Sequence, residues 1–169
     1  MITKAEFLAS LSHECQVAKH LYRKLPAGSL DYRPTPGQRS TLELLRYLSY
    51  VAIAMTDYVV TLKDNAYERR HKASQALKAK DFPKAMDRQM RELKALLGRI
   101  PEREFETRKV VLPWGFRGTL GAVLMNTSFK WLVAYRMQLF LYAKAAGASQ
   151  LSTSDCWMGK SAKPKPKKR

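Results

Sequence analysis

The sequence predicts an all-α protein, a bundle of four helices. Apolar residues recur at three- and four-residue steps through four long segments, which is the spacing of a helix that buries one face. Two of these segments open with a capping-box pattern, and glycine or proline follows three of them. Residues with high β-propensity gather in one short stretch, ETRKVVLPWGFRG. Together these observations favour a bundle over a sheet-containing fold.

The first predicted helix runs from Thr3 to Leu25. Thr3 and Glu6 match a capping box, in which each side chain bonds the backbone N–H of the other residue. Pro26 and Gly28 end the helix, and the following stretch, LPAGSLDYRPTPGQRS, predicts an ordered loop. The apolar face consists of Phe7, Leu8, Leu11, Val17, Ala18, Leu21 and Leu25.

The second predicted helix begins at Ser40, where Glu43 completes another capping box, and continues to about Lys63. Its apolar stripe is wide, which suits a helix in the middle of a bundle. The stripe consists of Leu44, Tyr47, Leu48, Val51, Met55, Tyr58, Val59 and Leu62. The polar passage after it, NAYERRHKASQALKAK, predicts a loop with a short helical turn or two.

The third predicted helix runs from Pro83 to about Arg99, and Gly98 and Pro101 are the signals that end it. Its apolar positions again keep helical spacing: Ala85, Met86, Met90, Leu93, Leu96 and Leu97. The stretch from Glu106 to Gly118 predicts an extended crossing segment.

The fourth predicted helix runs from Thr119 to Ala146, with Gly147 just past its end. Beyond it, SQLSTSDCWMGKSAKPKPKKR is typical of a mobile chain end. The predicted organisation is therefore one bundle domain, residues 1–150, followed by a basic, disordered tail, residues 151–169.

The chain carries a formal net charge of +17, from 31 Lys and Arg residues and 14 Asp and Glu residues. The last ten residues hold 6 of the basic residues, so the rest keeps 25 basic against 14 acidic residues, or +11. A positive charge of this size attracts polyanions such as RNA or DNA without selecting one of them, and it can equally serve solubility. The candidates for nucleic-acid contact are Lys160, Lys163, Lys165, Lys167, Lys168 and Arg169.

The sequence also indicates where the protein works. No apolar run reaches the roughly 18 residues that a membrane helix needs, and the best candidate, LSYVAIAMTDYVVTL, contains Asp57. The first residues lack the apolar run of a signal peptide. Cys15 and Cys156 stand far apart and do not describe a disulfide framework. We therefore expect a cytoplasmic protein without a membrane span.

Four pieces of sequence, in this order, resemble a known family. A helix ends in LP and leads to LDYRPTPGQRS, and the next helix opens with STLELLRYLSY. A PWG crossing then leads into TLGAVLMN, and the same helix carries YRMQLFLYAKAAG. Across about Phe7 to Gly147, this combination resembles the DinB/YfiT-like superfamily of four-helix bundles. The resemblance implies an up-down-down-up bundle, a long crossover before the last helix, and a homodimer formed through bundle helices.

The superfamily usually binds a divalent metal through one histidine on the second helix and two on the last, in a pattern like HxxxHRGQL. At the matching positions this chain has Tyr47, Trp131 and Tyr135, while Arg136 and Gln138 match the motif's R and Q. An indole offers a metal no lone pair, and a phenol binds well only as phenolate, from a group with a pKa of about 10. We therefore predict no metal and no cofactor.

Two interpretations of these five positions remain. The aromatic rings either fill the vacated space or line a pocket for a flat or cationic small molecule. The sequence contains no recognisable Ser/His/Asp cluster for nucleophilic catalysis and no glycine-rich loop for binding phosphate. His13 and His20 lie about 10.5 Å apart along one helix, too far to share a metal.

The favoured function is therefore a DinB-like protein that has lost the metal site and acts as a non-catalytic scaffold or small-molecule binder. One alternative is an enzyme, a metal-independent relative of the family's thiol-dependent transferases and isomerases, with Arg136 and Tyr135 holding an anionic thiol. The other is a nucleic-acid-associated protein that acts through its basic surface and tail.

Overall fold

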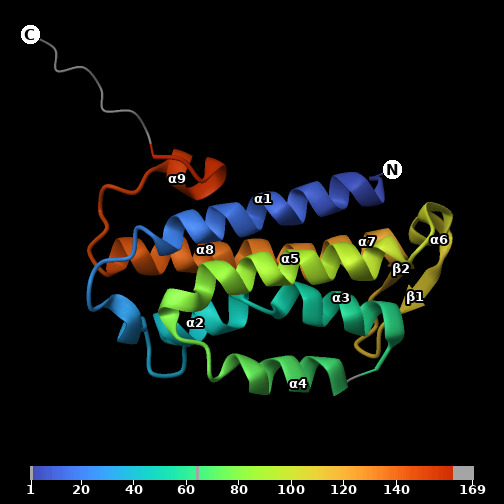
Figure 1. Cartoon of the computed structure of the whole chain (residues 1–169), viewed down its shortest axis with the longest axis horizontal. Helices are drawn as coiled ribbons and strands as arrows, with labels where there is room; N and C mark the ends of the chain where they lie inside the picture. Colours follow the sequence, from blue (N-terminus) through green and yellow to red (C-terminus); the bar gives the residue numbers. More distant parts are fainter. Residues whose placement is uncertain (1, 64, 162–169) are drawn as a thin grey trace, which may run out of the picture.

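The structure, a computed structural model, describes residues 2–63 and 65–161. Four helical stretches lie side by side and run up, down, down and up along the chain (Figure 1). The first is α1 (Lys4–Tyr22), the second is α2 (Thr41–Leu48) with α3 (Val51–Thr61), the third is α5 (Phe82–Gly98), and the fourth is α7 (Leu120–Leu124) with α8 (Lys130–Ala145). The predicted all-α class and the order of directions are confirmed.

Both predicted capping boxes are present. The Thr3 backbone N–H donates to Glu6 Oε2 over 2.8 Å, and the Ser40 backbone N–H donates to Glu43 Oε2 over 2.6 Å. Each bond satisfies a helix-terminal donor that has no partner inside the helix. The two helices therefore begin where the sequence predicts, whereas α1 ends at Tyr22, three residues earlier than expected.

The second predicted helix is broken. Instead of one helix from Ser40 to Lys63, α2 ends at Leu48 and α3 begins at Val51. Gln89 on α5 fills the break: its Oε1 accepts from the backbone N–H groups of Ala52 (3.0 Å) and Ile53 (3.2 Å). Its Nε2 donates to the Leu48 carbonyl over 2.9 Å. The buried Gln89 amide thus satisfies the backbone groups that the break exposes, which local periodicity does not reveal.

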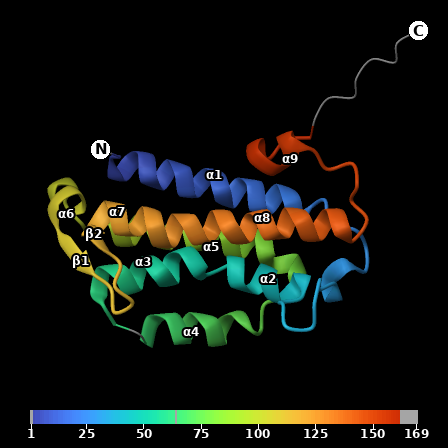
Figure 2. The same ribbon diagram turned by 180° about the vertical axis from the view of Figure 1, so that it is seen from behind.

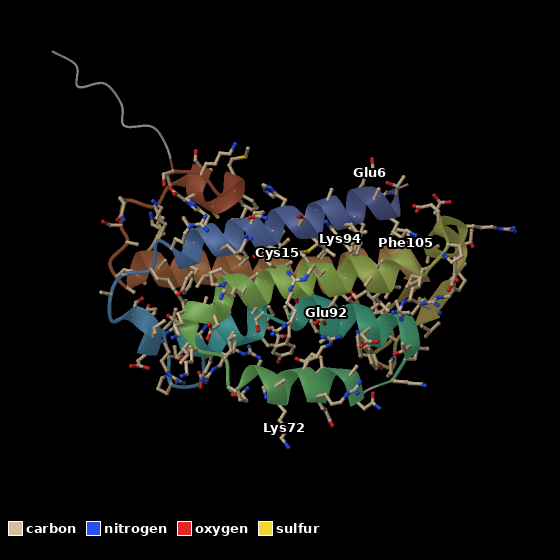
Figure 3. All side chains as sticks on the ribbon, viewed as in Figure 1. Glu6, Cys15, Lys72, Glu92, Lys94 and Phe105 are labelled. Atoms are coloured by element: carbon tan, nitrogen blue, oxygen red, sulfur yellow. The ribbon has the colours of Figure 1, made fainter. Side chains whose placement is uncertain are left out.

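The polar passage after α3 forms a helix of 10 residues, α4 (Asn65–Ser74), which is more than the short helical turn or two predicted within a loop there. Its Ala66 is buried, and its Arg70 pairs with Glu92 of α5 and Asp57 of α3. Lys72 projects from its outer side (Figure 3). These tertiary contacts stabilise a helix that has little apolar periodicity of its own.

The connections between bundle helices differ in what they span. Because α3 and α5 run in the same direction, the chain must return along the bundle between them, and α4 with the 3₁₀ turn Ala79–Asp81 does this (Figure 1). The long connection before α7, residues 99–119, stays at one end of the bundle (Figure 2). It contains α6 (Glu102–Thr107) and a hairpin of β1 (Lys109–Val111) with β2 (Arg117–Thr119).

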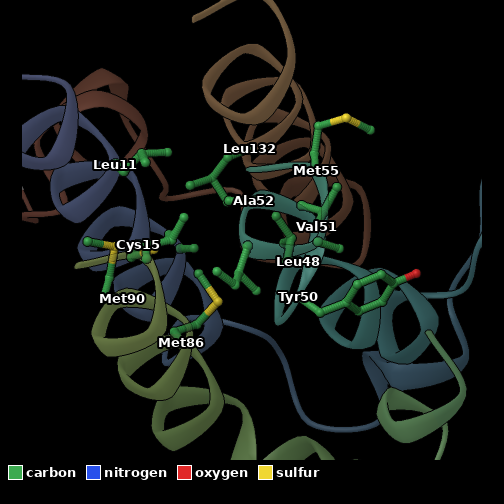
Figure 4. Close-up of a cluster of buried hydrophobic side chains, with 14 of the residues drawn as sticks. Leu11, Cys15, Leu48, Tyr50, Val51, Ala52, Met55, Met86, Met90 and Leu132 are labelled. Carbon is green, nitrogen blue, oxygen red and sulfur yellow. The ribbon is translucent and has the colours of Figure 1, made fainter. Parts of the chain in front are cut away.

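The core lies between the four stretches (Figure 4). Leu11 and Cys15 of α1 meet Met86 and Met90 of α5, with Leu132 of α8 beside them. Burial raises the pKa of the Cys15 thiol to about 12, so this cysteine is a neutral, small apolar group. A π-helical turn, Met125–Phe129, joins α7 to α8 within the fourth stretch.

Part of the predicted tail is folded. Within residues 151–161 the chain forms α9 (Thr153–Met158), which packs on α1, because Asp155 and Cys156 are buried there. His20 Nε2 of α1 lies 2.8 Å from Asp155 Oδ1. Residues 162–169, which hold five of the six basic residues predicted to contact nucleic acid, lie outside the described residues. Among the described helices, none has the length and apolar character to span a bilayer.

The Asp155 carboxylate makes the stability of the fold depend on pH. Burial by itself raises its pKa, but hydrogen bonds from His20, Ser152 and Ser161 outweigh burial and lower the pKa below its ordinary value of 3.8. A lowered pKa in the folded state means that the carboxylate stabilises the fold above about pH 4 and loses this effect as the pH falls further.

We therefore expect Asp155→Asn to lower the free energy of unfolding by about 1–3 kcal/mol at pH 7. This difference from the wild type should shrink as the pH falls from about 4 to 2. Urea unfolding followed by circular dichroism at each pH measures it. A difference that stays constant over this range would contradict the assignment.

Candidate functional site

The structure brings α2 and α8 together at the positions that the sequence singles out. The rings of Tyr47 and Tyr135 lie 4.6 Å apart between centroids, at 69° to each other. Trp131 stands one helical turn before Tyr135 on α8, half-buried against the core. These three aromatic residues therefore lie at the interface of the second and fourth stretches, as expected from their spacing.

An aromatic cleft of ≈ 380 Å³ opens beside them. Its walls come from α2, α3, α4, α8 and the hairpin turn, and its lining residues are Tyr47, Met55, Tyr58, Tyr67, Glu68, Trp114 and Trp131. Trp114 stacks on Tyr58 with centroids 5.7 Å apart and an angle of 17°. The predicted site did not include Met55 and Tyr58, which were assigned to the apolar stripe of the second helix. It also did not include Tyr67, Glu68 and Trp114, which α4 and the hairpin bring in from elsewhere in the chain.

Tyr47 also forms one wall of a second cleft, the arginine cleft, of ≈ 310 Å³. The Arg39 guanidinium lies 4.1 Å from the centroid of the Tyr47 ring and 5.4 Å from that of Tyr135. Arg33 in the same lining pairs with Glu43 at 3.2 Å. Tyr47 thus separates an aromatic cleft from a neighbouring cationic one.

Arg136 does not join the aromatic cleft, contrary to its assignment from the sequence. It is completely buried, and its Nε donates to Glu14 Oε2 of α1 over 2.7 Å. Its Nη1 donates to the Cys156 carbonyl over 2.8 Å. One residue along an α-helix turns the side chain by about 100°, so Arg136 faces α1 and α9 while Tyr135 faces α2.

Gln138 also lies outside the lining of the aromatic cleft. Its Nε2 donates to the Tyr142 hydroxyl over 2.6 Å, and that hydroxyl donates to the Arg39 carbonyl over 3.0 Å. Gln138 therefore contributes indirectly, by fixing the loop that carries Arg39. Of the five predicted site residues, Tyr47 and Trp131 line the cleft, and Tyr135 contacts the Tyr47 ring.

The donors at the family's metal positions do not fit a divalent metal. Burial raises the pKa of Tyr47 well above its ordinary value, and the hydrogen bond between the Tyr47 and Tyr67 hydroxyls adds to this effect. Its phenol therefore stays protonated, and the indole of Trp131 has no lone pair to give. Across residues 2–63 and 65–161, no three His, Cys, Asp or Glu side chains form a group that could hold a metal ion.

The histidines have other partners. His20 pairs with Asp155, His13 Nε2 lies 2.7 Å from the Trp157 carbonyl, and His71 Nδ1 lies 2.8 Å from the Tyr50 hydroxyl. The first two pairs help to hold α9 on α1. Each histidine therefore has a structural contact.

The sequence matches no protein-family model and no curated protein. Among solved structures, the chain is similar to the crystal structure of a DinB-like protein, YjoA, from Bacillus subtilis. The two share 16% sequence identity with a TM-score of 0.64, over 83% of this chain and 91% of that chain. A likeness at this identity establishes the architecture and not the activity. This chain has the DinB-like fold.

Proposed function

We propose that this protein is a non-catalytic binder of a small molecule, which it holds in the aromatic cleft. One observation carries the proposal: five aromatic rings from separate elements converge on one hollow of ≈ 380 Å³. Trp114 is 54% exposed there, although an apolar ring of this size gains from being covered. Clefts of this volume with aromatic walls and few polar groups are typical of ligand sites.

The chemistry of the lining supports binding without catalysis. General acid–base catalysis needs a group that exchanges a proton near neutral pH, and the raised pKa of Tyr47 keeps its phenol protonated. Within the described part of the chain, Glu68 is the one carboxylate in the lining, and no Ser, Thr, Cys or His lines the cleft with it. The loss of the family metal site is part of the same proposal, since the donors present do not suit a metal.

The alternative functions have less support. A thiol-dependent enzyme would need Arg136 to hold an anionic cofactor, but the Glu14 carboxylate already neutralises that guanidinium in the protein interior. Nucleic-acid contact through the tail remains a prediction, because residues 162–169 lie outside the described residues. The homodimer also remains a prediction.

Tryptophan fluorescence can test the proposal directly. The chain has three tryptophans, and two of them, Trp114 and Trp131, line the cleft. In a Trp157→Phe variant the signal comes from these two alone. We expect a saturable change in this signal with at least one member of a panel of planar and quaternary small molecules.

Trp114→Ala should weaken that binding by about tenfold or more, because it removes roughly 1.5–3 kcal/mol of apolar contact. Trp157→Ala is the matched control, since Trp157 is 48% exposed and lies on α9, outside the cleft. Calorimetric titration of the two variants and the wild type compares them without relying on fluorescence. The proposal fails if no compound binds, or if binding survives the loss of Trp114 unchanged.

A further inference from the structure

The charge of the aromatic cleft is opposite to that of the protein. The chain has 31 basic residues against 14 acidic ones, yet within residues 2–63 and 65–161 no Lys or Arg lines this cleft. The described part of its lining contains one acidic side chain, that of Glu68. Among the described residues, the charged side chain in the cleft lining is therefore acidic, although the chain as a whole is strongly basic.

The Glu68 carboxylate is also available to pair with a positively charged ligand. It is exposed on α4, and no basic group among the described residues lies within ion-pair distance of it. Lys72, one helical turn further along α4, extends away from the bundle (Figure 3). A positive ligand in the cleft would thus meet a carboxylate that has no partner within the described chain.

The aromatic walls favour positive charge as well. The face of an aromatic ring carries negative electrostatic potential and attracts a cation within about 6 Å of the centroid. The protein itself uses this property at the same ring, because the Arg39 guanidinium lies 4.1 Å from the Tyr47 centroid. Arg39 lines the arginine cleft and not the aromatic cleft, where the exposed ring of Trp114 and the half-buried ring of Trp131 remain for a ligand.

We infer that the ligand of the aromatic cleft is an organic cation with a quaternary or delocalised positive charge; this rests on the proposed function. A primary ammonium is strongly hydrated, and one carboxylate would replace little of its water. A quaternary or delocalised cation holds water weakly and gains from contact with several rings. The net charge of the protein opposes such a ligand at a distance, but screening limits this to about 8 Å at physiological ionic strength.

Three small molecules of similar shape separate the effect of ligand charge on binding from the effect of ligand size. Choline carries a quaternary nitrogen, 3,3-dimethylbutan-1-ol has carbon in its place, and 3,3-dimethylbutanoate carries a negative charge. Each is titrated into the full-length Trp157→Phe protein at physiological ionic strength and followed by tryptophan fluorescence. We expect choline to bind about 3- to 30-fold more tightly than the alcohol, which is the range that cation–π contacts provide. The anion should bind least.

Glu68→Gln tests the carboxylate. It should weaken choline binding up to about fivefold and leave the alcohol unchanged, because an exposed ion pair contributes at most about a factor of five. Glu106→Gln on α6 makes the same charge change outside the cleft lining and should have no effect. Equal binding of choline and the alcohol, tighter binding of the anion, or no binding of choline would overturn the inference. If neutral or anionic compounds bind in the cleft, the proposed function survives that failure, and if no compound binds, both fail.

Discussion

Replacing Gln89 with leucine is expected to lower the free energy of unfolding by about 3–6 kcal/mol. The substitution removes the partners of three backbone groups at the break between α2 and α3: two N–H groups and the Leu48 carbonyl. Each buried backbone group left without a hydrogen bond costs roughly 1–3 kcal/mol. Water reaches this position poorly, because Gln89 is 1% exposed.

Urea unfolding followed by circular dichroism measures the effect. Gln75→Leu is the matched control: Gln75 is exposed beyond α4, and its contact with the His71 carbonyl is long, at 3.4 Å. Gln89→Glu adds a second comparison, since a carboxylate still accepts from Ala52 and Ile53 but cannot donate to Leu48. If Gln89→Leu is as stable as Gln75→Leu, the break between the helices does not depend on Gln89.

Replacing Arg136 with methionine is expected to lower the free energy of unfolding by about 3–5 kcal/mol. The Arg136 and Glu14 side chains are 0% and 9% exposed and meet at 2.7 Å. Removal of one member leaves the other charge buried without its partner, which accounts for an effect of this size. The same change also removes the bond from Arg136 to the Cys156 carbonyl, so α9 should detach from α1 more readily.

The double variant Glu14→Gln/Arg136→Met should be more stable than Arg136→Met alone, because it leaves no uncompensated carboxylate in the interior. Arg88→Met is the control for a surface pair: Arg88 and Glu92 lie 3.9 Å apart with exposed side chains. We expect less than about 1 kcal/mol for that change. Hydrogen exchange within Thr153–Met158 reports the release of α9. If Arg88→Met and Arg136→Met lower the free energy of unfolding by similar amounts, the buried ion pair of Arg136 with Glu14 does not have the assigned role.

The candidate site was predictable only in part. The positions of Tyr47, Trp131 and Tyr135 followed from the family pattern, because residues four apart on a helix share a face. The same pattern misled for Arg136, since adjacency in the sequence places a side chain on a different face. Tyr67 gave no signal beyond being aromatic, and the position of Trp114 could not be read from the sequence. The reason is that α4 and the hairpin, which carry these residues, are positioned by contacts outside their own segments.

Neighbouring residues specify the helical class, the four apolar stripes and the two capping boxes at Thr3 and Ser40, so these features could be predicted from the sequence. The tertiary structure decided the break at residues 49–50, the folding of α4, and the docking of α9. The contacts responsible join residues far apart in the chain, 36 to 41 positions for Gln89 and 135 for His20 with Asp155. Periodicity reports only neighbours one or two helical turns away, so it could not reveal partners that meet after the chain has folded.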